Sequence, residues 1–354
     1  MQSQADGSYY TFQEIITQPA AWRAMLQDAD LQASTLRSYW LREKLQEVIC
    51  IGCGSTHFLA RTAAATFQGT TGVSGKAYPA SELLLFPHIV LSRSAGRMLV
   101  AISRSGETTE TLRAMETFRA RDSGPVLGVV CYPDTSLAKL ASSSLVAREA
   151  HEQSVAQTRS FTSMLVAVQA LVSIMAGHPL SRRFCELPEL GAAIIADGLT
   201  LAQQLGGDAA LERFYFLGSG PFYGLACEAM LKMKEMSLSY SEAYHFLEFR
   251  HGPMSMVNRQ TLVVGLLSTA ALPHEIAVLK DMRALGGRVL AITPAKVPSE
   301  AADYQIVLPQ GLTDLERGAL YLPALQLLAF YRSLRNGLNP DTPTNLTAVV
   351  NLDI

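Results

Sequence analysis

The chain has 354 residues, of which 49% are hydrophobic and 17% charged, and its formal net charge is −2. This balance excludes a disordered chain and is typical of a folded α/β protein with room for two domains. The near-neutral charge argues against a nucleic-acid partner held by bulk electrostatics. Neither a membrane-spanning apolar run nor a signal-peptide pattern occurs, so no membrane contact is expected. The five cysteines are scattered, and Cys50 and Cys53 have no second pair at zinc-site spacing, so we expect reduced thiols in a cytoplasmic protein.

The first half of the chain alternates predicted helices and strands. Residues 9–45 predict an N-terminal helical arm. The sequence CGST at 53–56 forms a glycine turn that opens a helix, but it lacks the third glycine of a dinucleotide fingerprint. Short connections between alternating strands and helices predict a parallel, doubly wound α/β sheet. The expected strands are 46–52, 73–77, 99–102, 125–131 and 144–148, and a buried helix is expected over 157–177.

The third of these strands runs into a loop rich in hydroxyl groups, LVAISRSGETTETL over 99–112. A strand that ends in such a loop and opens a helix presents backbone N–H groups and the positive end of the helix dipole to an anion. Ser103, Ser105 and Thr108 add side-chain donors, and Arg104 adds a positive charge suited to a phosphate group. The alternative is an ordinary loop whose serine and threonine side chains only cap the helix.

The second half repeats the plan of the first. Ser103 lies 51 positions after Gly52, and Ser268 lies 50 positions after Gly218, each glycine ending the first strand of its half. We therefore expect a tandem duplication of a flavodoxin-like doubly wound parallel sheet. The second copy reads STAA from Ser268 where the first reads SRSGETT, so only the first is expected to keep the anion site. The expected strands are 213–217, 261–268 and 288–293, the expected helices include 272–285 and 313–335, and the expected domains are an arm at 1–45, a first domain at 46–178 and a second at 179–354.

Candidate acid–base groups gather in the second half, between residues 227 and 257. Glu228, Lys232 and Glu235 follow the spacing i, i+4, i+7 and share one face of the helix after the second glycine turn. The alternative is a solvated stripe with a Glu228–Lys232 ion pair. His251 precedes a Gly-Pro pair, and the alternative for this histidine is a packed or solvated side chain. Metal-ligand spacing, GxSxG and the P-loop motif do not occur.

Several of these motifs occur together in one known family. SRSGETTETL, the CGST turn, EAMLKMKEMS and FRHGP resemble the sugar isomerase (SIS) family, in particular the isomerase half of glutamine–fructose-6-phosphate aminotransferases. The stand-alone relatives of that half include hexosamine-6-phosphate deaminases and ketose/aldose isomerases. The resemblance covers about residues 10–353, from F-x-E-I-x-x-Q-P at 12–19 to D-x-P-x-N-L at 341–346.

The resemblance implies two SIS domains that bind a hexose or hexosamine 6-phosphate, with neither a metal nor another cofactor. It implies that Glu235 is the base that moves a proton between C1 and C2, with Lys232 beside it. It implies that His251 opens the sugar ring and reaches the site of a neighbouring subunit, so a homodimer is expected. The residues implied to hold the phosphate are Ser103, Arg104, Ser105 and Thr108, and those implied to contact the sugar are Thr56, Val155 and Ala156.

Two departures from the family's pattern shape the expected reaction. A glutaminase domain and a cysteine at position 2 are absent, so we do not expect glutamine to supply nitrogen. The family's Schiff-base lysine falls on Ala348, and none of the seven lysines follows Lys296. A 2-amino sugar already carries its nitrogen, so proton transfer can form the substrate's own imine without an enzyme lysine. We therefore expect isomerisation coupled to deamination of a hexosamine 6-phosphate, the alternatives being a simple ketose/aldose isomerase and a non-catalytic sugar-phosphate-binding regulator.

Overall fold

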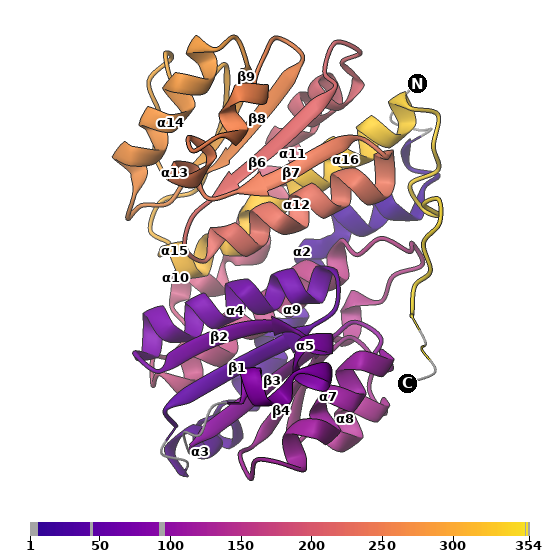
Figure 1. Ribbon diagram of the computed structural model, residues 1–354, viewed down its shortest axis with the longest axis vertical. Helices are drawn as coiled ribbons and strands as arrows, with labels where there is room; N and C mark the ends of the chain where they lie inside the picture. The colour runs from indigo at the N-terminus through magenta and orange to yellow at the C-terminus, as the bar shows by residue number, and fades with distance from the viewer. Residues whose placement is uncertain (1–5, 43–44, 92–95, 351, 353–354) are drawn as a thin grey trace. The chain divides into compact units, whose positions relative to one another are not determined.

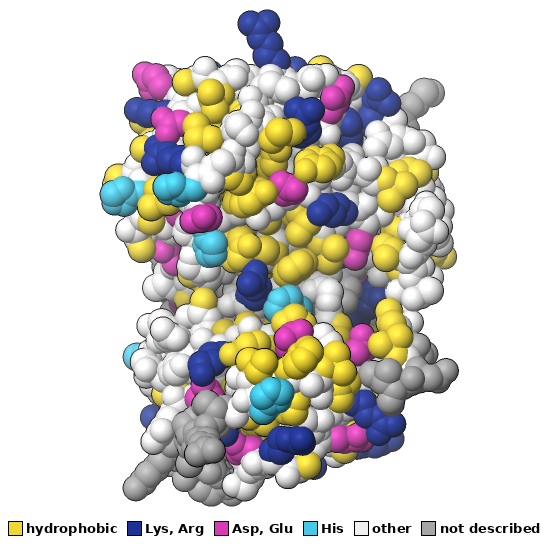
Figure 2. Space-filling view, in the orientation of Figure 1, with side chains coloured by type: hydrophobic (Ala, Val, Ile, Leu, Met, Phe, Trp, Pro, Cys, Tyr) yellow, Lys and Arg dark blue, Asp and Glu magenta, His cyan; other side chains and the backbone are white. Residues whose placement is uncertain are grey.

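The computed structural model describes residues 6–42, 45–91, 96–350 and 352 of the chain (Figure 1). The expected N-terminal arm forms two helices, α2 (Tyr10–Leu31) and α3 (Ala33–Arg42). Its residues 1–5 and 43–44 lie outside the described part. Among the described helices, none is long and apolar enough to cross a membrane. The face in Figure 2 intersperses basic and acidic side chains with apolar ones, and no broad region of one charge covers it.

The described residues form two parallel five-stranded sheets of the same strand order. The first sheet has the order β2-β1-β3-β4-β5, and the second has the order β10-β9-β8-β6-β7. If the strands of each half are numbered from 1 in chain order, the first sheet reads 2-1-3-4-5, and the second gives the same order when read from β7 to β10. This is the flavodoxin-like order. The expected tandem duplication is therefore confirmed. The strands are β1 (Glu47–Gly52), β2 (Ser74–Pro79), β3 (Arg97–Ser103), β4 (Val126–Val130), β5 (Ser143–Val146), β6 (Arg213–Gly218), β7 (Tyr240–Tyr244), β8 (Thr261–Leu266), β9 (Arg288–Thr293) and β10 (Tyr304–Val307).

Helices connect the strands within each half, as parallel pairing requires. The first half holds α4 (Ser55–Thr71), α5 (Ala80–Leu85), α6 (Pro87–Val90), α7 (Thr109–Arg119), α8 (Ser136–Leu140), α9 (Arg159–Met175) and α10 (Arg182–Cys185). The second half holds α11 (Leu187–Gly207), α12 (Phe222–Ser237), α13 (Phe246–Phe249), α14 (Leu272–Ala284), α15 (Asp314–Arg317) and α16 (Leu322–Arg335).

The chain divides into two compact units, each built on one sheet. We call them the β1–β5 unit and the β6–β10 unit. The second takes in two segments that are remote from its sheet in sequence, and both matter for the site described below. The β1–β5 unit comprises Thr17–Glu152, Arg159–Pro188 and the residues from Thr347 on, and the β6–β10 unit comprises the residues up to Ile16, Gln153–Thr158 and Glu189–Leu346.

Three expectations for the second half were wrong. The strands β7 and β10 were not expected from the sequence, because both lie at sheet edges and carry polar residues, YSEAY and YQIV, instead of a continuous apolar run. The helix expected over 313–335 is broken into α15, a 3₁₀ turn at Gly318–Tyr321, and α16. Pro323 stands in the first turn of α16, where its missing N–H costs nothing and favours a new start.

Apolar side chains from the buried central strands and their covering helices form the core of each unit. Strands β1, β3, β4 and β8 are buried along their whole length, as expected for parallel strands covered on both faces. The core of the β1–β5 unit includes Ile49, Ile51, Leu99, Met115 and Phe118, and that of the β6–β10 unit includes Tyr215, Phe249, Val263, Leu279 and Met282.

In each unit the first strand ends in a glycine that packs directly on the helix that follows. A Cβ atom on Gly52 would lie 2.5 Å from the carbonyl oxygen of Thr56, and one on Gly218 would lie 2.4 Å from that of Phe222. In both cases the contact is with the residue four positions on, at the start of α4 and α12. The close approach fixes the turn between strand and helix in both copies, and any side chain would push the helix away.

We therefore expect Gly52→Ala and Gly218→Ala each to lower the free energy of unfolding by about 2 kcal/mol, the typical cost of overpacking. The control is Gly69→Ala in α4, where the new Cβ meets nothing within 4 Å. That variant should be neutral or stabilised by up to ~1 kcal/mol, because alanine favours a helix. Urea unfolding followed by circular dichroism measures all three, and equal stability of the three variants would contradict the proposed contact.

The loop after β8 stands in the second sheet where the loop after β3 stands in the first. Here the protein's own carboxylates take the loop's donors. The Ser268 N–H and hydroxyl donate to Glu275 at 2.6 and 3.0 Å, and the Thr269 N–H lies 3.0 Å from both oxygens of Asp314. Burial raises the pKa of Glu275 to about 7, although the hydrogen bonds from Ser268 oppose the shift. These contacts give a physical reason to expect no anion site in the second copy.

The raised pKa of Glu275 predicts a pH-dependent stability. Between its usual value of 4.5 and about 7, the folded protein binds more protons at this group than the unfolded chain does. The free energy of unfolding should therefore fall as the pH rises through this window, by roughly 3 kcal/mol. Glu275→Gln should lack this loss, so its stability relative to the wild type should improve from pH 5 to pH 8.

Urea unfolding at several pH values tests this expectation, with Glu300→Gln as the same substitution at an exposed position. The control should keep the wild-type pH dependence. A constant difference between Glu275→Gln and the wild type across the window would rule out Glu275 as its source.

Candidate active site

The β3–α7 loop, Ser103–Thr108, is a tightly fixed turn at the carboxyl end of β3. Ser103 lies at the end of the strand, and the Gly106 N–H donates to its hydroxyl at 3.1 Å. Gly106 has a φ of 68°, and a Cβ atom there would lie 2.3 Å from Oγ1 of Thr135, so the turn requires glycine at this position. The N–H of Glu107 donates to the Ser105 hydroxyl at 3.1 Å.

The hydroxyl groups of this loop do more than cap the helix. Thr108 stands at the N-cap of α7, but its side chain makes no capping hydrogen bond. Its Oγ1 atom instead lies 3.2 Å from Oγ of Ser103, across the loop. The capping alternative raised by the sequence therefore does not hold for Thr108. The first-turn N–H groups of α7 have no acceptor within the helix, and together with the loop hydroxyls they offer donors to an anion.

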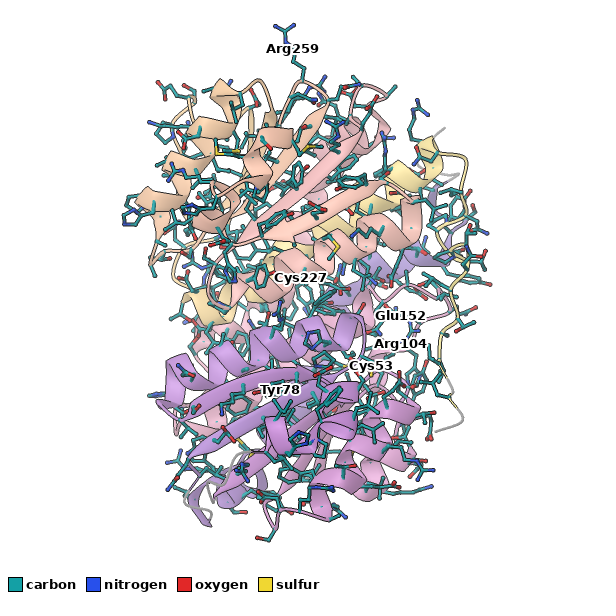
Figure 3. The ribbon with its side chains drawn as sticks, viewed as in Figure 1. Cys53, Tyr78, Arg104, Glu152, Cys227 and Arg259 are labelled. Carbon is teal, nitrogen blue, oxygen red and sulfur yellow. The ribbon has the colours of Figure 1, made fainter. Side chains whose placement is uncertain are left out.

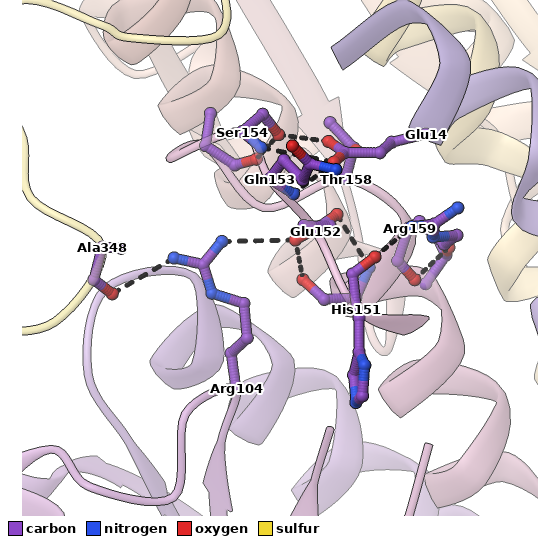
Figure 4. A network of polar contacts seen from close by, with 12 residues as sticks. Glu14, Arg104, His151, Glu152, Gln153, Ser154, Thr158, Arg159 and Ala348 are labelled. Carbon is purple, nitrogen blue, oxygen red and sulfur yellow. Dashed lines mark hydrogen bonds and ion pairs between the residues drawn. The ribbon is translucent and has the colours of Figure 1, made fainter. Parts of the chain in front are cut away.

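Arg104 is the cation of the β3–α7 loop, and its charge is balanced by a buried carboxylate (Figures 3 and 4). The guanidinium Nη1 lies 3.2 Å from Glu152, whose side chain is completely buried. Its Nη2 donates to the carbonyl oxygen of Ala348 at 3.1 Å. Glu152 also accepts the Ser160 N–H at 2.9 Å and the Ser160 hydroxyl. The two contacts thus hold the Arg104 side chain in one orientation, and Glu152 balances its positive charge.

The turn after β1 brings Thr56 to the same edge of the first sheet. Thr56 is buried, and its Oγ1 atom accepts the Cys53 N–H at 2.9 Å and lies 3.0 Å from the Cys53 carbonyl oxygen. Cys53 and Arg104 both lie at this end of the β1–β5 unit (Figure 3). Parallel pairing of β1 with β3 places their carboxyl ends together, at the point where the strand order reverses.

The cysteines at this edge are free thiols. Cys50 is buried within β1, and burial raises its pKa; the Cys53 Sγ lies 3.6 Å from Oγ1 of Thr111, and burial raises its pKa as well. Neither is poised as a thiolate at neutral pH. In the part of the chain that the structure describes, no three His, Cys, Asp or Glu side chains are grouped to hold a metal ion.

Val155 and Ala156 belong to the β6–β10 unit, in the segment Gln153–Thr158. Val155 is half-buried and its N–H donates to the carbonyl oxygen of Asp341 at 3.0 Å, while Ala156 is 2% exposed. The segment is therefore held at Val155 by a backbone hydrogen bond, and Ala156 beside it is buried.

Helix α12 buries a lysine between two carboxylates. Lys232 is 1% exposed, with its Nζ 3.3 Å from Glu228 and in direct contact with Glu235. Burial by itself would lower the pKa of Lys232, but the charges of Glu228 and Glu235 outweigh it and hold the pKa above its usual value. The Glu228–Lys232 ion pair exists, but the solvated stripe offered as the alternative is wrong, because both side chains are fully buried.

Glu235 differs from its two partners in being accessible. Its side chain is 18% exposed, whereas those of Glu228 and Lys232 are 0% and 1% exposed. The contact with Lys232 fixes one oxygen of the carboxylate in a side chain that stays partly exposed. Such a held, partly accessible carboxylate is suited to taking a proton from a bound molecule and returning it.

His251 lies on the turn between α13 and the 3₁₀ turn Pro253–Met256. Its side chain is exposed, and its backbone N–H donates to the carbonyl oxygen of Glu248 at 2.9 Å. Gly252 follows with a φ of 128°, which permits the sharp reversal after the histidine. His251 is therefore not packed in the core, and its exposure agrees with the solvated side chain of the alternative as well as with the expected role.

Three residues that organise the site were not identified from sequence. Glu152 directly precedes the segment Gln153–Thr158, but no sequence pattern around it indicates that it pairs with Arg104, which is 48 positions away. Glu14 and Asp341 lie in the N- and C-terminal motifs, whose roles the sequence left open. The apolar residues Phe12 and Ile15 on either side of Glu14 in FQEII are a signal that could have pointed to a buried, paired carboxylate.

The sequence matches the model of one protein family in both halves. The SIS domain model matches residues 42–174 and 210–331, which contain the two sheets. The resemblance inferred from the motifs is therefore confirmed.

Curated relatives match along nearly the whole chain. The D-galactosamine-6-phosphate deaminase AgaS of Escherichia coli O157:H7 is 29% identical over 357 residues, which cover 95% of this chain and 91% of the relative. The glutamine–fructose-6-phosphate aminotransferase of Methanothermobacter thermautotrophicus is 26% identical over 350 residues, which cover 98% of this chain. The match covers only 58% of that aminotransferase, so this chain is similar to little more than half of it.

Solved structures share the fold of both units. The tagatose-6-phosphate ketose/aldose isomerase of Escherichia coli has a TM-score of 0.86 at 26% identity, with 98% of this chain and 97% of that one covered. The glucosamine-6-phosphate deaminase of Thermotoga maritima has a TM-score of 0.80 at 28% identity, with 97% and 100% covered. The duplicated sheet, the match in both halves and these neighbours together show that the chain belongs to the SIS domain family.

Proposed function

We propose that the chain is a phosphosugar isomerase that converts a hexosamine 6-phosphate into a ketose 6-phosphate and releases ammonia. The observation that carries the proposal is the buried ion-pair cluster of α12, which holds Glu235 as an accessible carboxylate against Lys232. The β3–α7 loop, with its hydroxyl groups and Arg104, supplies an anchor for a phosphate.

Phosphate binding rests on the donors of the β3–α7 loop. Ser103, Ser105 and Thr108 contribute hydroxyl groups, and the N-terminus of α7 contributes its free N–H groups and dipole. Arg104 contributes charge, and Glu152 and the Ala348 carbonyl already set its orientation. Anchoring the phosphate restricts the open-chain sugar, which lowers the entropic cost of bringing its C1 and C2 atoms to a catalytic group.

Glu235 carries the proton in this scheme. As the base it removes the hydrogen on C2 of the open-chain amino aldose, and the electron pair forms a 1,2-enolamine. The same carboxyl group returns the proton to C1, which gives the 2-imine of the ketose. Lys232 keeps the carboxylate in position through their direct contact. Thr56, Val155 and Ala156 are assigned to the sugar.

Ammonia leaves by ordinary imine hydrolysis. Water adds to C2 of the imine and the C–N bond breaks, so amino sugar phosphate and water yield ketose phosphate and ammonia. This route uses no enzyme lysine, in keeping with Ala348 at the position of the family's Schiff-base lysine. The Escherichia coli and Thermotoga maritima relatives named as deaminases support this choice over a simple isomerisation.

A sugar-phosphate panel tests the reaction. Glucosamine 6-phosphate, galactosamine 6-phosphate and fructose 6-phosphate are each incubated with the protein, and ammonia and ketose are measured. At least one amino sugar phosphate should yield both products in equal amounts. Conversion of fructose 6-phosphate into an aldose phosphate, with no ammonia from either amino sugar phosphate, would favour the simple isomerase, and tight binding without any turnover would favour the regulator.

Glu235→Gln should bind the sugar phosphate about as well as the wild type but lower kcat by about 10²–10⁴-fold, because the amide cannot accept the proton. Isothermal titration measures the binding, and the ammonia assay measures kcat. The matched control is Glu300→Gln, the same substitution at an exposed position, which should keep full activity. Normal turnover by Glu235→Gln would overturn the assignment of the base.

His251 is assigned to ring opening in the site of a second copy, so we propose a homodimer. Two features support this: the histidine is exposed, and the exposed apolar side chains of Leu247 and Met256 flank it in sequence. A surface with such apolar side chains suits contact with another subunit.

Co-expression of two inactive variants tests the shared site. Glu235→Gln and His251→Ala should each be nearly inactive, but mixed dimers contain one site in which both residues are intact. Random pairing then restores about a quarter of the wild-type activity, since half of the dimers are mixed and each has one working site. Activity no higher than that of the single variants, with mixed dimers confirmed by differential tags, would place both residues in the same subunit's site.

A further inference from the structure

Hydrogen bonds from backbone N–H groups hold the segment Gln153–Thr158 in place. The side chain of one buried glutamate, Glu14, accepts two of them (Figure 4). Oε1 of Glu14 accepts the N–H of Gln153 at 2.5 Å and the N–H of Ser154 at 3.2 Å. Its Oε2 accepts the Ser154 hydroxyl, whose oxygen also lies 3.1 Å from the carbonyl oxygen of Ala156. One carboxylate thus meets two successive backbone donors and one side-chain donor.

The next residue of the segment is held by the C-terminal motif. The Val155 N–H donates to the carbonyl oxygen of Asp341 at 3.0 Å. The carboxylate of Asp341 accepts the N–H groups of Tyr10 and Thr11, at 3.0 and 2.8 Å, and the Thr11 hydroxyl at 2.7 Å. Asp341 therefore binds the first turn of α2, the helix that carries Glu14, as well as the segment itself.

The far end of the segment is held as well. The Thr158 carbonyl accepts Nε2 of Gln326, a buried side chain of α16, at 3.1 Å. Glu14 itself is 4% exposed. A buried carboxylate is costly unless donors surround it, so Glu14 and the segment stabilise one another only in this arrangement.

We propose that Glu14, aided by Asp341, is a positioning residue that sets the backbone of Gln153–Ala156 for contact with the sugar. The inference rests on the proposed function, which assigns Val155 and Ala156 to the substrate. It gives the motifs at the two ends of the chain a shared role, because Glu14 and Asp341 both bind the segment that carries Val155 and Ala156. Ser154 is the link through which the Glu14 side chain reaches Ala156.

The consequence concerns sugar binding more than phosphate binding. The hydrogen bonds of Glu14 to Gln153 and Ser154 lie within the β6–β10 unit, whereas the β3–α7 loop belongs to the β1–β5 unit. Loss of the carboxylate should therefore weaken interactions of the sugar while leaving the affinity for inorganic phosphate unchanged. A general loss of structure would weaken both.

The experiment compares Glu14→Ala, Glu14→Gln and Ser154→Ala, with Glu300→Ala as the exposed control. Glu14→Ala should raise KM for the sugar phosphate about tenfold or more, because small displacements of positioning groups are costly. Glu14→Gln keeps an oxygen for the two N–H groups and should stay within about threefold of the wild type. The inhibition constant of inorganic phosphate should not change in any variant.

Amide hydrogen exchange of the ligand-free protein provides a readout independent of turnover. The amides of Gln153 and Ser154 should exchange faster in Glu14→Ala than in the wild type and the control. If the wild type converts no sugar phosphate, the proposed function fails, while the exchange data still decide the role of Glu14. Should Glu14→Ala fold poorly, Ser154→Ala removes one hydroxyl only and should raise KM in the same direction.

Two results would overturn the inference. One is wild-type exchange of the segment together with a wild-type KM in both Glu14→Ala and Ser154→Ala. The other is a parallel rise of KM and of the phosphate inhibition constant, which marks a general structural role. A double variant, Glu14→Ala with Ser154→Ala, should be no worse than Glu14→Ala alone if the two act through one contact.

Discussion

Parallel pairing of the strands places the candidate anion site, the β3–α7 loop, at one edge of its sheet. In a parallel sheet every strand ends at the same edge, and every crossover helix begins there. Both sheets use the same order, so the turns after β1 and β3 stand beside each other, as do those after β6 and β8. Gly52 and Gly218 bring the next helix close to the end of the strand, because a Cβ atom at either position would collide with the helix backbone.

Within this shared frame the two copies have divergent chemistry. The loop after β3 keeps its hydroxyl groups, and its cation is paired with the buried Glu152. In the loop after β8, the protein's own Glu275 accepts the hydrogen bonds that Ser268 would otherwise offer to a ligand. The β6–β10 unit instead has its cluster of charged residues on α12. There the two carboxylates offset the desolvation cost of the buried Lys232. One copy thus keeps a cluster of hydroxyl donors with a paired cation, and the other keeps a partly exposed carboxylate paired with a buried lysine.

Pre-paired charges are common to both units. Arg104 meets Glu152, Lys232 meets Glu228 and Glu235, and Glu14 meets backbone donors. In each case the desolvation cost of a buried charge is offset by a partner that also fixes its direction. Groups held in this way need little reorganisation when a ligand arrives, which is the property that catalytic and binding sites require. The same pairing explains why single substitutions here are expected to affect geometry as well as charge.

Local sequence patterns were enough to predict the α/β class, the duplication, the β3–α7 loop and the charged face of α12. Each of these is written in residues that are neighbours along the chain, as an apolar run, a glycine turn or a helical spacing. Edge strands such as β7 were not predicted, because a strand with one neighbour and a partly exposed face has no continuous apolar run. Which charges are buried, and which of them are paired, emerged only from the packing of the folded chain. Glu14 meets Ser154 across 140 positions, and Thr11 meets Asp341 across 330, and no local pattern encodes contacts between residues so far apart in sequence.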